Sequence, residues 1–381
     1  MKTKSLLTLM LVPLMIGCAN SGENTSSEST ETTITDGQGR TVTYDKAKLS
    51  RVVCIGAGAL RYYSYIGDIS KLVGVEKIDT PETTVGVGKA LRPYYEANKE
   101  TFKDLTIIGE GGPAAQTADV EKLAAARPDI IVSFLSEEKN DNLQSAINVP
   151  VIGLNQGPDG VFDATTLNSF RVLGEVFNRT ERYNELNNYI TTCKMDFDSL
   201  TKTEDTYYFG GIGNWGQTSM LGTMLNFPVI KYAKVKSALE DLEIRDKDGN
   251  IVTKGQVSID REKLVEANPD HIFMDTAGLN GFISDYTENK TTYDALKAFQ
   301  NGETYQVMPY NAYYSNLEIQ LMSTYYVASI AHEGFTINLE TKMNEITNKF
   351  LGKDMYNDIK AHKYGLGGYK KVDLKAAEPI Q

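Results

Sequence analysis

The sequence predicts an α/β fold made of two related, Rossmann-like lobes, and three observations lead to this prediction. Short apolar runs such as 51–55 and 130–134 alternate with helical patterns, as in βαβ units with parallel strands. Residues 120–132 align without a gap onto residues 261–273, so the second half repeats the scheme of the first. Residues 163–200 separate the halves and contain no proline and a single glycine, which favours a connecting helix.

The chain begins with a segment of the signal-peptide type, predicted over residues 1–17. Lys2 and Lys4 precede an apolar run from Leu6 to Ile16. This run covers about 11 residues, whereas a membrane span needs about 20, so a permanent transmembrane helix is disfavoured.

Cys18 follows this segment in a sequence, residues 15–18, that resembles the bacterial lipobox. In that motif the cysteine is diacylated and becomes the mature N-terminus; an ordinary cleaved signal with an incidental cysteine is the alternative. Residues 18–33 are rich in Ser, Thr, Glu, Asn and Gly, a composition that stays solvated and flexible. We therefore expect a lipid anchor and a tether on the extracytoplasmic face of the cell membrane.

The N-terminal α/β lobe is predicted over residues 34–162. It opens with β-branched residues that alternate around Asp36-Gly37, which indicates a hairpin. The buried run 51–55, which contains Cys54, predicts the first core strand. The elements expected after it are a helix at 60–66, a strand at 72–75, a helix at 120–126, and strands at 130–134 and 151–154.

The connecting segment is predicted as one long helix over residues 163–200, with a break near Asn178 to Glu181 left open. Its apolar residues keep helical spacing. They are Leu167, Phe170, Leu173, Phe177, Leu186 and Ile190. One stiff connection would limit the relative motion of the two lobes.

The C-terminal α/β lobe is predicted over residues 201–381. In each copy of the repeat a helix containing Glu-Lys-Leu ends before a Pro-Asp pair, Pro128-Asp129 in the first and Pro269-Asp270 in the second. Proline ends a helix because it has no N–H group and disfavours the α conformation of the residue before it. A buried strand follows in each case.

Composition excludes several classes of function. The 381 residues carry 39 basic and 50 acidic side chains, a net charge of -11, which argues against a nucleic-acid binder. Three histidines and three cysteines are too few for a His-rich metal cage or a disulfide framework, so no metal site is predicted. Cys54 and Cys193 receive no functional role. The chain has no G-x-S-x-G nucleophile elbow, so an extracellular hydrolase is only a remote alternative.

The order of these motifs resembles the substrate-binding lipoproteins of ABC importers for iron complexes, haem and cobalamin. The similarity runs from about residue 34 to residue 355. Besides the lipobox, the segments that carry it are 36–40, 51–56, 72–75, 121–129 and 149–154. The resemblance implies a class III periplasmic-binding-protein-like fold, with two lobes joined by one long helix and a ligand held between them. It also implies a monomer without cofactor or catalysis, whose partners are the permease and ATPase of the importer.

Glu121 and Glu262 occupy paired positions of the repeat. In the resembling family, a glutamate at the tip of each lobe docks the permease by pairing with arginines, and these two residues match by motif. The alternative is that they are solvated acids favoured by the dipole at the start of a helix.

Candidate ligand contacts in the first lobe follow from the rule that open α/β sheets bind ligands beyond the carboxyl ends of their strands. Arg61 and Tyr62 come just after the first core strand, and Arg92 and Tyr94 form a second basic and aromatic cluster. A guanidinium offers a planar fork of donors to carboxylate or catecholate oxygens. Packing at the surface or within a loop is the alternative for each cluster.

Candidate contacts in the second lobe begin with Trp215, in the glycine-rich loop of residues 207–216. Gly211, Gly213 and Gly216 match G-x-G-x-x-G, but an exported lipoprotein has little access to a dinucleotide. A loop that presents the single tryptophan to a flat ligand is preferred, with a core position for Trp215 as the alternative.

A Tyr- and Asn-rich stretch similar to one in the family supplies the remaining candidates, Tyr310, Asn311, Tyr313 and Tyr314. Tyrosine combines a flat apolar ring with a polar hydroxyl, and asparagine both donates and accepts hydrogen bonds. Such residues suit a large, partly aromatic ligand. The leading hypothesis is a ferric siderophore, and a corrinoid or haem bound by the same fold is the alternative.

Overall fold

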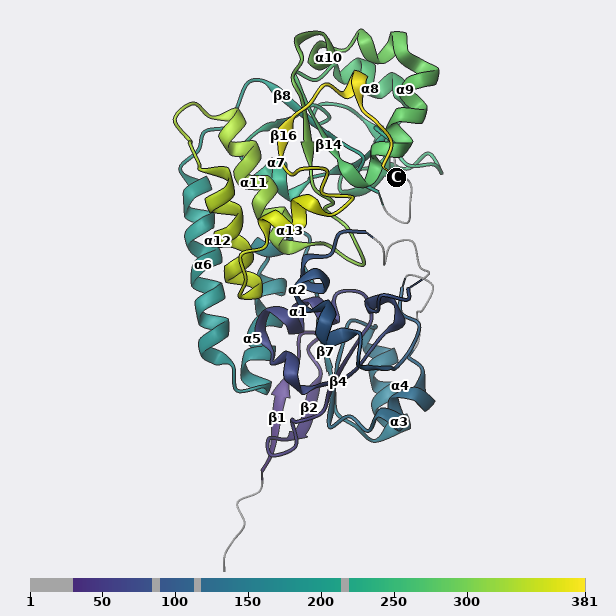
Figure 1. The fold of residues 1–381 in the computed structure, drawn as a ribbon, viewed down its shortest axis with the longest axis vertical. Helices are drawn as coiled ribbons and strands as arrows, with labels where there is room; N and C mark the ends of the chain where they lie inside the picture. The colour runs from purple at the N-terminus through teal and green to yellow at the C-terminus, as the bar shows by residue number, and fades with distance from the viewer. Residues whose placement is uncertain (1–29, 84–89, 113–117, 214–218, 381) are drawn as a thin grey trace, which may run out of the picture.

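The computed structural model describes residues 30–83, 90–112, 118–213 and 219–380, which form two lobes stacked along the long axis of the molecule (Figure 1). Each lobe is built around a five-stranded sheet. The predicted α/β fold with two lobes is confirmed.

The N-terminal sheet has the strand order β5-β4-β3-β6-β7, and its strands are all parallel. Its strands are β3 Val52–Ile55, β4 Leu72–Val75, β5 Thr106–Ile107, β6 Ile130–Ser133 and β7 Val151–Gly153. Every residue of β3 and β6 is buried, because helices cover both faces of a parallel sheet and its central strands are therefore continuous apolar runs. Helices α1 Ala59–Ile66, α2 Pro93–Phe102, α3 Val120–Ala126 and α4 Glu137–Ile147 belong to this lobe.

The C-terminal sheet has the order β10-β8-β14-β15-β16, in which only β16 is antiparallel to its neighbour. Its strands are β8 Thr206–Gly210, β10 Lys236–Ser237, β14 His271–Asp275, β15 Thr304–Val307 and β16 Lys370–Lys371. The helices of this lobe are α7 Pro228–Tyr232, α8 Arg261–Ala267, α9 Leu279–Asp294 and α10 Lys297–Asn301.

Three antiparallel hairpins or pairs lie outside the two main sheets. They are β1 Glu31–Thr35 with β2 Thr41–Asp45, β9 Gly222–Leu225 with β13 Gly255–Ser258, and β11 Ile244–Arg245 with β12 Ile251–Val252. The first of them is the hairpin predicted around Asp36-Gly37, and it lies at the lower end of the N-terminal lobe in Figure 1. The Oδ1 atom of Asp36 accepts hydrogen bonds from the backbone N–H groups of Gln38 and Arg40, both at 2.9 Å, and these bonds close the turn.

The sequence repeat is a structural repeat. The Oδ2 atom of Asp129 accepts hydrogen bonds from the backbone N–H groups of Ser50 and Arg51 at 3.0 Å. In the second lobe, Oδ2 of Asp270 accepts from the backbone N–H of Thr206 at 3.0 Å and from its hydroxyl at 2.8 Å. Each Pro-Asp aspartate therefore ties the start of the strand that follows it, β6 or β14, to the neighbouring strand, β3 or β8.

The segment between the lobes contains two helices, α5 Ala164–Val176 and α6 Thr180–Asp198, so the single helix predicted over 163–200 is corrected. The break lies where the sequence left one open. Asn178 adopts a left-handed conformation with φ 53°, which asparagine tolerates better than most residues, and the N–H of Arg179 turns back to the carbonyl of Gly174 at 2.7 Å.

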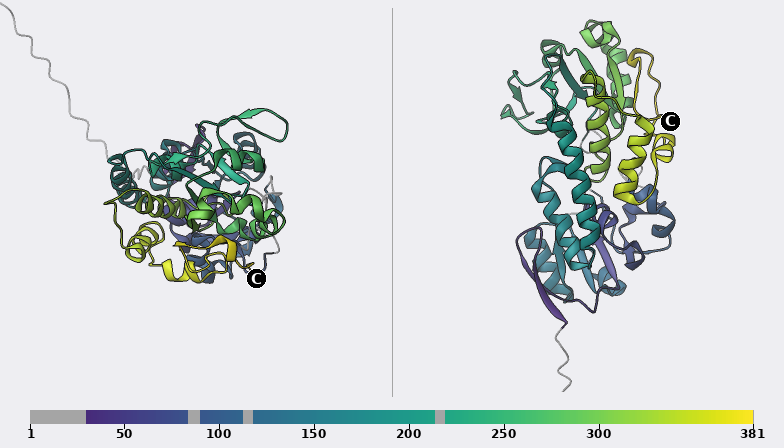
Figure 2. Two further views of the ribbon diagram at one scale, coloured as in Figure 1. Left: turned by 90° about the horizontal axis from the view of Figure 1, so that it is seen from above. Right: turned by 90° about the vertical axis from the view of Figure 1, so that its left-hand side faces the viewer.

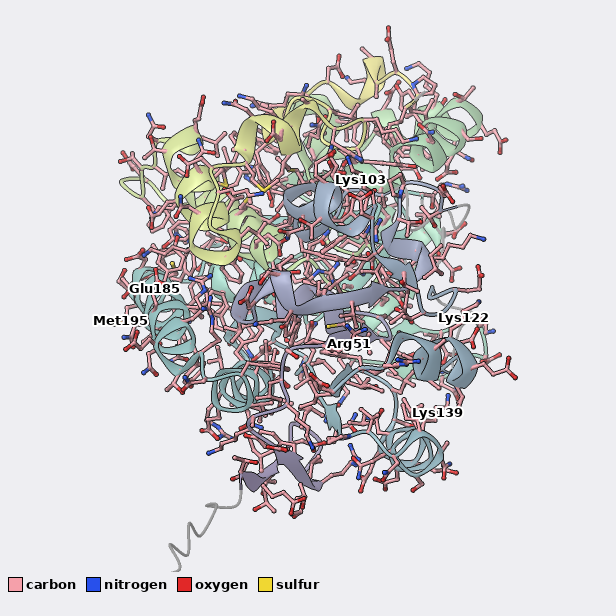
Figure 3. The ribbon with its side chains drawn as sticks, turned by 60° about the horizontal axis from the view of Figure 1, so that its bottom comes forward. Arg51, Lys103, Lys122, Lys139, Glu185 and Met195 are labelled. Atoms are coloured by element: carbon pink, nitrogen blue, oxygen red, sulfur yellow. The ribbon has the colours of Figure 1, made fainter. Side chains whose placement is uncertain are left out.

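Helix α6 runs from the N-terminal lobe to the C-terminal lobe, as Figure 1 and the right-hand view of Figure 2 show. Its last turn reaches the C-terminal helices, where the ring of Phe197 lies 4.6 Å from that of Tyr325. Figure 3 shows Glu185 and Met195 projecting from the outer side of α6, and Met195 is 66% exposed. One side of this helix therefore faces solvent while the other packs between the lobes.

The C-terminal helices α11 Leu317–Ala331, α12 Leu339–Leu351 and α13 Tyr356–Ala361 return toward the N-terminal lobe and form a second connection. Arg182 of α6 illustrates it, since its Nε donates to the carbonyl of Tyr65 at 2.8 Å and its Nη2 donates to the carbonyl of Phe350 at 3.1 Å. One continuous core of buried apolar residues includes members of both sheets and of α1, α5, α6, α11 and α12. The lobes are thus joined by more than the single helix that the family resemblance implies.

Among the described residues, no helix combines the length and the apolar character needed to cross a membrane.

Candidate functional site

Among the contacts between the lobes is the loop Tyr310–Asn316, which we call the junction loop. It follows β15 of the C-terminal sheet and contacts α1 of the N-terminal lobe and the residue that follows β4. The carboxyl ends of strands from both sheets therefore face the same region, where open α/β sheets bind their ligands.

The junction loop is closed on itself by backbone bonds. The N–H of Asn316 donates to the carbonyl of Tyr310 at 2.8 Å, and Asn311 pairs with Ser315 in an isolated antiparallel bridge. At its apex Tyr313 and Tyr314 both have positive φ angles, 52° and 77°. Two consecutive left-handed residues other than glycine are unusual, and such strained backbone concentrates at functional sites.

Arg61, a predicted ligand contact, lies fully buried against this loop. Its Nη1 donates to the carbonyl of Tyr313 at 3.0 Å. Its Nη2 donates to the carbonyl of Ala312 at 2.6 Å and to Oδ1 of Asn316 at 3.0 Å. The guanidinium also lies 4.8 Å from the centre of the Tyr94 ring. In this arrangement the donor fork of Arg61 is occupied by the protein itself.

Arg92 and Tyr94, the second predicted cluster, are also buried and share one carboxylate. Arg92 forms an ion pair with Asp79, and the Tyr94 hydroxyl donates to the same oxygen of Asp79 at 2.6 Å. The Arg92 guanidinium lies 4.6 Å from the centre of the Tyr95 ring. This cluster contacts Arg61 through the ring of Tyr94.

Glu76, the first residue after β4, holds the junction loop from the N-terminal lobe. The hydroxyl of Tyr313 donates to Oε2 of Glu76 at 2.7 Å, and the N–H of Gly56 lies 3.2 Å from both carboxylate oxygens. Burial raises the pKa of Glu76 to about 7; nearby Asp79 adds to the increase, while the hydrogen bond from Tyr313 opposes it.

Asp275, the last residue of β14, holds the loop from the C-terminal lobe. Its carboxylate accepts hydrogen bonds from the N–H of Tyr310 at 2.8 Å and from the N–H of Ala277 at 2.9 Å. Burial raises the pKa of Asp275 to about 7, against the lowering effect of these two bonds. A buried carboxylate from each lobe therefore holds the junction loop, Asp275 at its first residue and Glu76 at its apex.

Tyr314 is the predicted candidate that stands out toward solvent, with 41% of its surface exposed. Its ring packs edge-on against Phe134, 5.6 Å away between ring centres. A Cβ atom added to Gly58 would lie 3.3 Å from the Tyr314 ring, so glycine is what lets the ring approach the start of α1.

The other predicted contacts surround this ring. Tyr62 is buried, and its hydroxyl donates to Oε1 of Gln156 at 2.9 Å. Asn311 is partly buried, and its amide lies 3.5 Å from the carbonyl of Gly213. Tyr310 is buried, 4.9 Å between ring centres from Phe227. The side chains at the surface of the junction are therefore aromatic rings and amides, whereas Arg61 and Arg92 are buried beneath them.

Sequence reasoning missed Glu76, Phe134, Gln156 and Asp275. Each lies at or just after the end of a parallel strand: Glu76 after β4, Phe134 after β6, Gln156 shortly after β7, and Asp275 at the end of β14. The rule that selected Arg61 would have found them if it had been applied to every strand instead of mainly the first of each lobe.

Four predicted functional residues are not part of the junction that the structure describes. Trp215 and Cys18 lie outside the described residues. Glu121 and Glu262 are exposed in the first turns of α3 and α8, at the lower and upper ends of the molecule in Figure 1. Asp119 caps α3 by accepting from the N–H of Lys122 at 3.1 Å.

Two surface cavities lie away from the junction loop. One of about 270 Å³ is formed by β11 and the start of α8, and one of about 500 Å³ lies between the ends of α6 and α11. No group of three or more His, Cys, Asp or Glu side chains within the described part of the chain is arranged to hold a metal ion.

Comparison with known sequences gives one family. A sequence model described as "Periplasmic binding protein" matches residues 62–310. No curated protein sequence matches the chain.

Comparison with solved structures gives several bacterial solute-binding proteins of low sequence identity. A periplasmic solute binding protein from Veillonella parvula has 13% identity and a TM-score of 0.63, covering 85% of this chain and 94% of that chain. An ABC transporter solute binding protein from Sulfurospirillum deleyianum has 19% identity and a TM-score of 0.59, covering 88% and 99%. The molybdate periplasmic binding protein of Haemophilus influenzae, solved with molybdate, has 15% identity and a TM-score of 0.57, covering 85% and 98%. At these identities the similarity concerns the fold.

Proposed function

The chain belongs to the periplasmic binding protein family, the solute-binding components of ABC importers, and we propose that it captures an iron complex, a ferric siderophore, at the lobe junction. The observation that carries this proposal is the convergence of both sheets on the junction loop. Glu76 and Asp275, one from each lobe, hold the loop that exposes Tyr314. A ligand seated there would touch both lobes, as a binding protein that senses its ligand by lobe movement requires.

Binding, and not chemistry, is the proposed task. The ligand contacts would come from the ring of Tyr314, the amides of Asn311 and Gln156, and Trp215 of the glycine-rich sequence 207–216. Aromatic rings and amides provide contact area and orientation for a large ligand with peripheral polar groups. The iron is then part of the cargo, and the protein needs no cofactor of its own.

Delivery would follow from two further proposed features. Diacylated Cys18 and the tether of residues 18–33 would keep the body at the outer face of the membrane. Glu121 and Glu262, exposed at the far ends of the two lobes, would dock the permease by pairing with its arginines. A docking surface that spans both lobes can report whether the junction is occupied.

A corrinoid or haem is the second candidate ligand, and a specific observation favours it. The guanidinium groups of Arg61 and Arg92 are buried and bonded within the protein, so the surface that the described residues expose at the junction is aromatic and amide in character. Such a surface can stack against a flat macrocycle, but it offers no free guanidinium to the anionic groups that many ferric siderophores carry.

The test is a titration of the purified protein with ferric enterobactin, ferrichrome, haemin and cyanocobalamin, followed through the fluorescence of its single tryptophan. We expect saturable quenching by a ferric siderophore at micromolar concentration or below. Saturation by haemin or cyanocobalamin alone would select the second candidate. No response to any of the four would contradict the proposal.

A further inference from the structure

We propose that Arg61 is a positioning residue: it holds the junction loop in its left-handed turn and so presents the ring of Tyr314, without contacting the ligand itself. The inference rests on the proposed function, because it assigns Arg61 a role in the ligand site. The sequence alone suggested that Arg61 binds an anionic group of the ligand directly; here Arg61 acts on the ligand only through Tyr314. The two roles predict different effects of substituting Arg61.

The first step of the argument is the conformation of the loop apex. Tyr313 and Tyr314 have φ angles of 52° and 77°, a region in which the Cβ atom of an L-residue crowds the backbone. Such a conformation persists only where surrounding contacts fix it. The hydrogen bond from the N–H of Ala312 to the carbonyl of Tyr314, at 3.0 Å, belongs to this turn and depends on it.

The second step is the match between the guanidinium and the turn. The left-handed apex directs the carbonyls of Ala312 and Tyr313 to the same side, and Arg61 donates to both of them, at 2.6 and 3.0 Å. Its third bond goes to Oδ1 of Asn316, whose amide nitrogen donates to the carbonyls of Leu91 and Pro309 at 3.0 and 2.9 Å. A planar fork with several donors fits such a set of acceptors, whereas an ammonium group does not.

The third step is accessibility. Arg61 is fully buried, and the ring of Tyr94 lies over its guanidinium at 4.8 Å. Tyr314 is 41% exposed, although it adjoins the carbonyl of Tyr313 to which Arg61 donates. Arg61 can therefore affect a ligand through the position of the Tyr314 ring. The ligand class that this arrangement selects is one recognised by a ring face, and Arg61 offers no direct hydrogen bond to an anionic group on it.

A double-mutant cycle tests the coupling on whichever of the four titrated ligands binds the wild type. We expect Arg61→Met and Tyr314→Ala each to weaken binding roughly 10-fold, and the double variant to be no weaker than the stronger single effect, because Arg61 acts through Tyr314. Additive losses, roughly 100-fold in the double variant, would show independent contacts and overturn the inference.

Hydrogen exchange tests the positioning without any ligand, so it separates failure of this inference from failure of the proposed function. In ligand-free protein the amides of Ala312 and Asn316 should exchange at least about 10-fold faster in Arg61→Met than in the wild type, because the turn that protects them loosens. Unchanged exchange at both amides would overturn the inference, whatever the titrations give.

Arg182→Met is the matched control. Arg182 likewise donates to carbonyls of two elements, those of Tyr65 and Phe350, but at the other end of α1. It should leave the exchange of Ala312 and Asn316 and the ligand affinity unchanged. If Arg61→Met does not fold, Arg61→Lys replaces it; the lysine keeps the charge but loses the fork, so the two amides should still exchange faster, and wild-type exchange would again overturn the inference.

Discussion

The hydroxyl of Tyr313 donates a hydrogen bond across the lobe junction to the carboxylate of Glu76, at 2.7 Å. Tyr313 lies in the loop after β15 of the C-terminal sheet, whereas Glu76 is the first residue after β4 of the N-terminal sheet. The same carboxylate faces the N–H of Gly56 after the first strand. One buried acid therefore links the ends of two strands of one lobe to the junction loop of the other.

This link predicts a dependence of stability on pH. Glu76 is 8% exposed, and burial raises its pKa from the ordinary value of 4.5 to about 7 in the folded protein. A carboxyl with a raised folded pKa binds its proton more tightly when folded, so its contribution is fully present below pH 4.5 and is lost as the pH rises through 7. Asp275, with a pKa of about 7, contributes in the same direction.

We therefore expect Glu76→Gln, which is permanently neutral, to reduce the loss of unfolding free energy between pH 5 and pH 8 by an amount on the order of 1–3 kcal/mol. Urea denaturation at the two pH values measures it. Glu137→Gln, on the exposed first turn of α4, is the control and should keep the wild-type dependence. An identical pH dependence in Glu76→Gln and the wild type would contradict the prediction.

Charge reversal at the lobe tips should separate transport from binding. In Glu121→Lys and Glu262→Lys we expect ligand affinity and thermal stability to stay at wild-type values, because both side chains are exposed. Stimulation of the ATPase of the reconstituted importer should fall roughly 10-fold, since a like charge would face the permease arginines. Glu288→Lys, an exposed position on α9, is the control. If both Glu121→Lys and Glu262→Lys stimulated the ATPase as strongly as the wild type, the proposed docking role of these glutamates would be contradicted.

Cys18 should determine where the protein resides in the cell. Cys18→Ala is expected to shift the protein from the membrane fraction to the soluble extracytoplasmic fraction and to abolish incorporation of labelled palmitate, because one diacylated cysteine supplies the anchor. Cys193→Ala, at a buried position of α6, should leave both unchanged. Retention of Cys18→Ala in the membrane fraction would argue for another mode of attachment.

The parts of the fold that could be predicted from the sequence are those set by local pattern. The Pro-Asp pairs, Pro128-Asp129 and Pro269-Asp270, located the helix ends and central strands of both lobes, because proline and buried apolar runs act on their own neighbourhood. The same local information could not decide whether the connecting segment is one helix or two. Asn178 permits a left-handed turn but does not require one.

The role of Arg61 could not be predicted in this way. Its acceptors, the carbonyls of Ala312 and Tyr313, lie 251 and 252 residues further along the chain, and they face Arg61 only because of the left-handed apex at Tyr313 and Tyr314. A tyrosine pair gives no local signal for such a turn, which usually requires glycine. The sequence thus identified residues of the junction, but not which of them face solvent and which support the others.

The most direct test of the account is the affinity of Tyr314 variants for the ligand that the wild type binds among the four titrated compounds. Tyr314→Ala should weaken binding roughly 10-fold without changing the unfolding midpoint, and Tyr314→Phe, which keeps the ring, should bind within about twofold of the wild type. Wild-type affinity in Tyr314→Ala would contradict the claim that the ligand lies against the junction loop.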